Sequence, residues 1–332
     1  MIKFLRNNQQ IFISLIFLYS FISVFSVYFT STSIDLVDQP FSLPLLSGAY
    51  FNLLSRSNFL FIAALLISII LIFSGFYLVR MGINYLIISQ RSQFSALFFI
   101  AISSFCFREE LFNGAGIASI FLLLTMDRVI GSLDQRGRSY RFLDAGLLLA
   151  LGSLFYLNLI FLLPFLWVAQ LLLRPFSWRE LVYTLGGISI PVIYLLSGAF
   201  ILDKPVGELF DQWTQWIALR KIISTNLYFL AGIGFYLLMM VIGSFYAMRK
   251  FATTKIQSRK LYQLLFFLFV NIILILLLVP SVGIEIMFLL AIPASVLLSI
   301  YFTDCRNSLI NRLIFIILLL IPLALNIVES FL

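Results

Sequence analysis

Eight charged residues form the clearest candidate site in this sequence. A carboxylate at a membrane surface can act as a general base on an acceptor hydroxyl, and Arg side chains can hold a phosphate through paired hydrogen bonds. The candidate catalytic residues are Asp35, Asp38, Glu109 and Glu110, and the candidate phosphate- or lipid-binding residues are Arg56, Arg108, Arg220 and Lys221. The alternative is that all eight are ordinary solvated loop charges.

The apolar composition of the chain decides which elements must position these residues. Of its 332 residues, 62% are hydrophobic and 11% are charged, whereas a soluble domain is about 45–50% apolar and about 25% charged. A chain with so few polar residues cannot cover its own surface in water. We therefore predict an all-α, polytopic transmembrane helical bundle that forms a single integral membrane domain over residues 1–332.

Apolar runs between charges predict about eleven membrane spans, because a helix needs about 20 apolar residues to cross the hydrocarbon core. The predicted spans are 11–30, 58–79, 94–107, 112–130, 145–158, 159–173, 181–202, 225–247, 262–280, 285–302 and 313–330. The uncharged stretch 145–173 is open to two interpretations. It can form one long tilted helix, or two short helices with a break around Asn158 and Pro164.

The distribution of Lys and Arg predicts the orientation of the chain. With the N-terminus inside and the C-terminus outside, 17 of the 22 Lys and Arg residues fall on the inner side and five on the outer side. Treating 145–173 as one helix gives 11 on each side, so the charges favour two short helices. The eight candidate residues then lie on the outer side. Because the net charge of +8 reflects orientation, we expect no nucleic-acid partner.

Residues 203–222 are predicted to form an interfacial amphipathic helix on the outer face. Leu209, Trp213 and Trp216 recur at helical spacing, opposite Glu208 and Asp211 on the polar face. A helix of this kind lies at the level of the lipid headgroups, with its Trp side chains at the boundary.

Missing residue types exclude several classes of site. The chain has no His, which excludes His-ligated metals and nucleophile pairs of the Ser-His or Cys-His kind. It contains neither a P-loop nor a GxGxxG fingerprint. We therefore expect no metal site and no cofactor.

Few polar residues interrupt the apolar runs. Asn158, Gln170, Asn271 and Asn326 are predicted to form hydrogen bonds between helices. Glu285 lies near the outer edge of a predicted span, from where its side chain can reach water. An ionisable residue at such a position is a functional candidate.

The charges of the inner side are largely explained by orientation. Arg136, Arg138 and Arg141 are also expected to attract anionic lipid. Arg179 and Glu180 are adjacent opposite charges, and we expect them to neutralise each other locally at the inner interface.

Two stretches of the sequence resemble a known family. They are LRPFSWRE at 173–180, followed by Gly186, Gly187 and Pro191, and FLDAG at 142–146, leading to LFY at 154–156. They resemble an uncharacterised family of polytopic bacterial inner-membrane proteins, and the resemblance covers most of the chain. It implies a multi-pass protein of the bacterial inner membrane and carries no activity with it.

More remotely, the layout resembles the membrane glycosyltransferases of the GT-C superfamily, which use a polyprenyl-linked sugar as donor. On this resemblance, the base is Asp35 or Asp38 and a second acidic group is Glu109 or Glu110. The donor phosphate would be neutralised by Arg56, Arg108, Arg220 or Lys221. The chain departs from the superfamily pattern in its short first outer loop, which lacks an adjacent pair of acidic residues, and in having no soluble outer domain.

Three functions remain open on the sequence. The first is an envelope enzyme that acts on a lipid-linked sugar or a lipid phosphate, and the second is a non-catalytic membrane scaffold or assembly partner. The third is a transporter, which is the least supported because no internal repeat and no midplane charge is found. The expected partners are membrane lipids, a polyprenyl-phosphate-linked sugar and another membrane protein.

Overall fold

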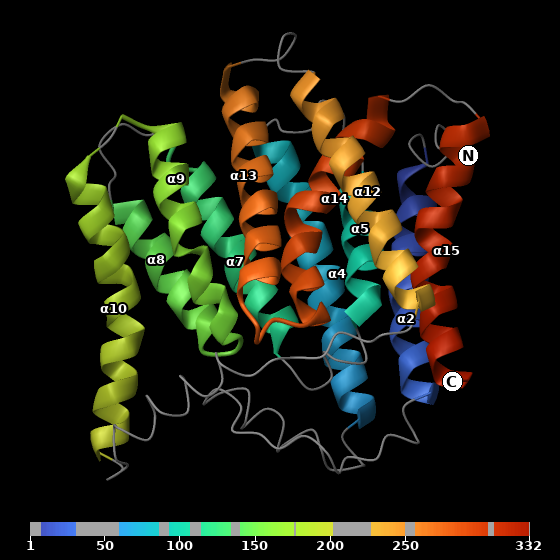
Figure 1. The fold of residues 1–332 in the computed structure, drawn as a ribbon, viewed down its shortest axis with the longest axis horizontal. Coiled ribbons are helices and arrows are strands. Elements are labelled where there is room, and N and C mark those ends of the chain that lie inside the picture. The colour runs from blue at the N-terminus through green and yellow to red at the C-terminus, as the bar shows by residue number, and fades with distance from the viewer. Residues whose placement is uncertain are drawn as a thin grey trace.

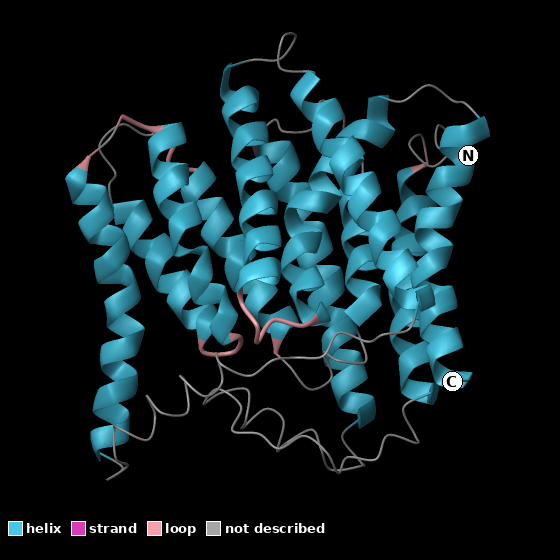
Figure 2. Cartoon of the chain, viewed as in Figure 1, coloured by secondary structure: helices cyan, strands magenta, loops and turns pink. Residues whose placement is uncertain are grey.

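The described part of the chain is a bundle of α-helices. The structure is a computed structural model, and it describes residues 8–30, 60–85, 93–106, 114–133, 140–175, 177–201, 227–249, 256–304 and 309–331. Within these residues there are eleven α-helices, three short 3-10 helices and no strand (Figure 2). The prediction of an all-α helical bundle is therefore confirmed.

A helix lies at each of the eleven segments expected from the apolar runs. The α-helices are α2 (Gln9–Thr30), α4 (Leu60–Asn84), α5 (Phe94–Ser103), α7 (Ala115–Ile130), α8 (Tyr140–Ser153), α9 (Leu163–Leu173), α10 (Trp178–Ile201), α12 (Leu227–Arg249), α13 (Ile256–Leu278), α14 (Met287–Asp304) and α15 (Leu309–Phe331). The 3-10 helices are η3 (Ser104–Cys106), η4 (Leu157–Leu162) and η6 (Ile284–Ile286). The stretch 145–173 forms two helices, α8 and α9, joined through η4.

Six of the described helices are long and apolar enough to cross a bilayer. These segments are Ala64–Asn84, Trp178–Ile201, Ala231–Arg249, Gln257–Leu278, Ile284–Asp304 and Leu309–Asn326. Because their apolar length matches the roughly 30 Å hydrocarbon core, the chain is an integral membrane protein.

Successive helices run in alternating directions between two ends of the bundle (Figure 1). All nine described Lys and Arg residues lie near the end at which α2 begins, which we call the basic end. They are Arg80, Arg128, Arg141, Arg174, Arg179, Arg249, Arg259, Lys260 and Arg312. The other end, at which α15 finishes, is called the opposite end. The side of the membrane that the basic end faces stays a prediction from the charge rule.

The centre of the bundle is formed by α5 and α14. All ten residues of α5 are buried, and so are nearly all residues of α14. A ten-residue helix is about 15 Å long, which is half the thickness of the hydrocarbon core. α5 therefore needs the enclosure that α2, α4, α14 and α15 supply. Aromatic rings fill the contact, with Phe98 5.1 Å from Phe302 and 5.8 Å from Phe315 between ring centroids.

A proline in α15 leaves a backbone carbonyl without its helical donor, and a side chain of another helix supplies the hydrogen bond. Pro322 has no N–H group, so the carbonyl of Leu318 loses its usual helical donor. The Tyr236 hydroxyl of α12 donates a hydrogen bond to this carbonyl, and the Tyr19 hydroxyl of α2 donates to the next one, Leu319 O, at 2.9 Å. Two other helices thus satisfy backbone groups of α15 at a depth without water.

α10 lies at one edge of the bundle and packs mainly on α8 (Figure 1). The two backbones approach closely at two glycines. A Cβ atom on Gly146 would lie 2.3 Å from Thr184 O, and one on Gly187 would lie 2.2 Å from Leu143 O. The neighbouring Gly186 has no atom within 4 Å of the same position. Of the adjacent pair Gly186 and Gly187, only Gly187 is therefore required for this contact.

The two adjacent glycines give a matched test of this packing. We expect Gly187→Ala to destabilise the protein by about 1–3 kcal/mol, because the added methyl group overlaps a backbone carbonyl. Gly186→Ala should be neutral or stabilise by up to about 1 kcal/mol through helix propensity. The midpoint of thermal unfolding in detergent measures both. Equal midpoints for the two variants would contradict the close approach of α8 and α10.

The orientation of the bundle in the membrane is tested by a reporter fused after Leu332. The predicted orientation places the basic end in the cytoplasm, so a reporter that is active only outside the cytoplasm should be active in this fusion. A fusion after Arg249, at the basic end, is the matched control and should be inactive. Activity in the reverse pattern would refute the predicted orientation.

Candidate functional site

The eight residues predicted from the sequence lie outside the described residues. They are Asp35, Asp38, Arg56, Arg108, Glu109, Glu110, Arg220 and Lys221. The predicted amphipathic helix 203–222 also lies outside them. The described helix ends that flank these segments are at the opposite end of the bundle: α2 and α4, η3 and α7, and α10 and α12 (Figure 1). The assignment of these residues to one site stays a prediction.

A buried carboxylate lies at this opposite end. Glu285 belongs to η6, the 3-10 turn that opens α14, and its side chain is fully buried. Its Oε1 atom accepts a hydrogen bond from the Gly283 N–H at 3.1 Å. The expectation that Glu285 reaches outer water was wrong, because η6 is packed against η3 and α14.

Amide side chains connect the same region. Asn158 of η4 accepts a hydrogen bond from the Ser281 hydroxyl at 3.1 Å and donates one to the Tyr156 hydroxyl at 3.3 Å. Asn326 of α15 donates to the Ser104 carbonyl of η3 at 3.0 Å. The predicted role of these two Asn residues in hydrogen bonding between segments is confirmed. Together the three 3-10 helices bring a carboxylate, an amide and hydroxyl groups to the opposite end of the bundle.

This set of groups limits the chemistry that the described residues can perform there. A carboxylate, an amide and hydroxyls can bind hydroxyl groups and accept a proton, but Glu285, Asn158 and Ser281 are buried and bonded to protein groups. None of the described Lys or Arg residues lies at this end, so the described part of the chain provides no cation for a phosphate there. A phosphate at this end would need the basic residues predicted from the sequence.

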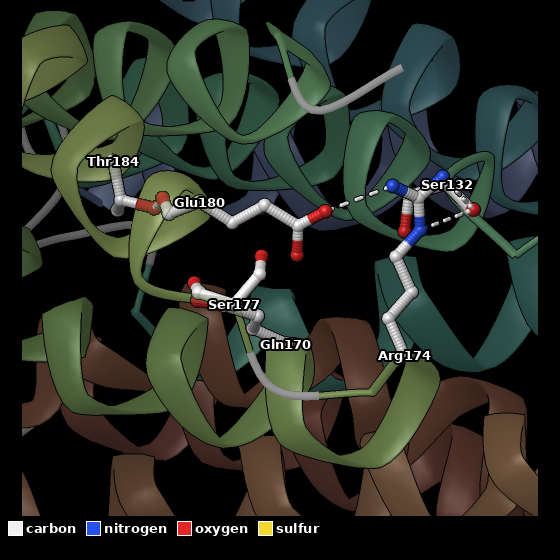
Figure 3. Close-up of polar contacts among 6 residues, drawn as sticks. All are labelled: Ser132, Gln170, Arg174, Ser177, Glu180 and Thr184. Atoms are coloured by element: carbon white, nitrogen blue, oxygen red, sulfur yellow. Dashed lines mark hydrogen bonds and ion pairs between the residues drawn. The ribbon is translucent and has the colours of Figure 1, made fainter. Parts of the chain in front are cut away.

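The second buried polar centre, drawn in Figure 3, lies between the end of α9 and the first turns of α10, at the basic end. Arg174 directly follows α9 and precedes Pro175, which restricts it to its extended conformation. Its Nη1 atom lies 2.9 Å from Glu180 Oε1, and its Nε and Nη2 atoms donate to Ser132 O at 2.9 and 2.7 Å. The Arg174 and Glu180 side chains are only 11% and 6% exposed. This is a buried ion pair that also binds the end of α7.

Further hydrogen bonds surround this ion pair. Gln170 Nε2 donates to Ser177 O at 2.8 Å, and the Thr184 hydroxyl donates to Glu180 O at 2.9 Å. Lys260 of α13 donates to Leu173 O, at the end of α9, at 3.1 Å. Basic side chains thus satisfy carbonyls at the ends of both α7 and α9, where helices leave backbone acceptors unpaired.

This centre was not predicted from the sequence. Glu180 was expected to pair with the adjacent Arg179, but successive residues of a helix point about 100° apart, so Glu180 faces inward and Arg179 is exposed. The signal that was available is the order Arg-Pro at the end of a predicted span, with an acidic residue in the first turn of the next one.

Comparison with known proteins identifies the family of the chain. Residues 36–330 match a family described as a family of unknown function (DUF6427). The chain belongs to this family. No curated protein matches it, and no solved structure does. The resemblance to an uncharacterised family is therefore confirmed. For this DUF6427 protein, no cluster of three or more His, Cys, Asp or Glu residues that could hold a metal ion occurs in the part of the chain that the structure describes.

The buried ion pair is tested by removing its charges one at a time. Arg174→Gln or Glu180→Gln leaves one buried charge without its counter-charge and should destabilise the protein by about 3–5 kcal/mol. The double variant should recover part of this loss. The exposed Arg179→Gln is the matched control and should change stability by less than about 0.5 kcal/mol. Thermal unfolding in detergent measures all four proteins. If Arg174→Gln were as mild as Arg179→Gln, the structural role of the pair would be refuted.

Proposed function

We propose that this DUF6427 protein is an envelope enzyme of the bacterial inner membrane that handles a lipid-linked phosphate at the outer leaflet. The specific form of the proposal is a glycosyltransferase similar to the GT-C enzymes, with a polyprenyl-phosphate-linked sugar as donor. In this proposal the opposite end of the bundle faces the outside of the cell.

The observation that carries the proposal is the arrangement of the opposite end. The turns that join α8 to α9 and α13 to α14, which contain η4 and η6, lie nearer the middle of the bundle than the ends of α4 and α10 (Figure 1). Irregular backbone at membrane depth is tolerated where protein buries it or where it lines a polar space. Here protein buries a carboxylate, an amide and hydroxyls, which are the types of group that bind sugar hydroxyls, so the proposal requires the substrate to enter between these segments.

The proposal assigns proton removal and phosphate binding to the residues predicted from the sequence. Asp35 or Asp38 would remove a proton from the acceptor hydroxyl, with Glu109 or Glu110 as a second acidic group. Arg56, Arg108, Arg220 or Lys221 would hold the donor phosphate by charge-assisted hydrogen bonds. Each of these residues falls between described helix ends that lie at the opposite end.

The catalytic proposal is tested by complementation of a deletion strain. Asp35→Asn and Asp38→Asn keep the size of the side chain and remove the base, so at least one of them should abolish complementation while the protein level stays normal. Glu208→Gln, on the polar face of the predicted amphipathic helix, is the matched control and should complement fully. Full complementation by both Asp variants would eliminate the carboxylate role.

A second candidate is a non-catalytic scaffold or assembly partner for another membrane protein. It is favoured by the use of buried polar groups in structural contacts, such as Asn158 with Ser281 and Arg174 with Glu180. Affinity purification in mild detergent separates the two candidates: a stoichiometric partner supports the scaffold, and a lone protein opposes it.

A further inference from the structure

Three arginines gather where α4, α7 and α8 meet at the basic end. Arg80 lies near the end of α4, Arg128 in the last turn of α7, and Arg141 in the first turn of α8. α7 packs against both α4 and α8. The Tyr77 hydroxyl is within electrostatic reach of both Arg80 and Arg128. We call these three residues the arginine corner.

A tyrosine engages Asp127, the residue that precedes Arg128 in α7. The Tyr85 hydroxyl donates to Asp127 Oδ1 at 3.0 Å, and it also contacts Asp127 O at 3.2 Å. Burial, together with the negative charge of Asp127, raises the pKa of the Tyr85 hydroxyl well above its ordinary value. The hydroxyl therefore stays protonated and continues to donate to Asp127.

The Arg141 side chain is positioned by a glycine. A Cβ atom on Gly131, directly after α7, would lie 2.2 Å from Arg141 Nη1 and 3.0 Å from the Tyr85 hydroxyl. The guanidinium of Arg141 therefore occupies space that any other residue at position 131 would fill. This places a planar cation over the end of α7, beside Tyr85.

The other two arginines face the surroundings of the protein. The Arg128 side chain is 53% exposed, and its Nη1 atom lies 3.8 Å from Asp144 Oδ2, which is too long for a hydrogen bond. Arg80 is exposed and forms no ion pair with any described residue. Guanidinium groups bind phosphate with two parallel hydrogen bonds, a geometry that Lys cannot offer.

An apolar surface on α4 continues from Arg80 toward the membrane centre. Leu66, Ile69 and Phe73 are exposed, and their spacing places them on the same face of the helix as Arg80. A ligand with a phosphate at Arg80 would therefore lay an apolar chain along these three side chains. A free phosphate ion would leave this surface unused.

We propose that the arginine corner binds the phosphate of an anionic phospholipid, whose acyl chain lies along the exposed face of α4. The positive-inside rule predicts that this end is basic, but it does not predict a cluster at one corner with an adjoining apolar face. The site is at the end opposite to the proposed catalytic face, so it does not depend on the proposed function.

The proposal is tested by lipid titration of the purified full-length protein in detergent. The midpoint of thermal unfolding is recorded with phosphatidylglycerol and, separately, with phosphatidylcholine of the same acyl chains. Phosphatidylglycerol should stabilise the wild type and phosphatidylcholine should not, because a ligand that binds the folded state raises its stability. Arg80→Gln combined with Arg128→Gln should need about tenfold more phosphatidylglycerol for half of the shift.

Matched variants separate a defined site from net charge. Arg179→Gln combined with Arg249→Gln makes the same charge change at the same end and should keep the wild-type response. Gly131→Ala changes no charge but displaces the Arg141 guanidinium, so it should weaken the response. Equal weakening in the two double variants would overturn the proposal. A shift of the same size with inorganic phosphate would overturn the assignment to a lipid.

Discussion

The hydrocarbon interior of a bilayer contains no water to bind a free N–H or C=O group, so each helix end and each break at that depth needs a partner inside the protein. The short helix α5 meets this requirement by complete enclosure. The breaks at η4 and η6 meet it by packing at the opposite end, with Asn158, Ser281 and Glu285 among the groups engaged. Irregular segments of this bundle are therefore found where neighbouring segments can satisfy them.

The same requirement explains why the basic residues do more than orient the chain. Arg174 binds the carbonyl of Ser132 beyond α7, and Lys260 binds the carbonyl of Leu173 at the end of α9. A Lys or Arg at such a position satisfies an acceptor and places its charge at the negative end of a helix dipole. The basic end is thus a structural layer as well as an orientation signal, which leaves fewer of its charges free to bind ligands.

Apolar runs and the charges between them were sufficient to predict the helices, because both can be read from the local composition of the sequence. The division of 145–173 into two helices followed from counting charges on each side. Contacts that depend on three-dimensional packing were not predictable in this way. Glu180 has a charged neighbour at 179, yet its partner is Arg174, and Glu285 is buried where η6 packs against η3. The candidate residues Asp35 and Arg56 belong to segments outside the described residues, so their assignment still rests on the sequence.

The proline of α15 has a consequence for how the protein is assembled. The carbonyl that Pro322 deprives of its helical donor is bonded by Tyr236 of α12, and the next carbonyl is bonded by Tyr19 of α2. Both donors precede α15 in the chain and so are synthesised first. When the last helix enters the membrane, the two hydroxyl groups that bond its carbonyls therefore belong to helices that have already been synthesised.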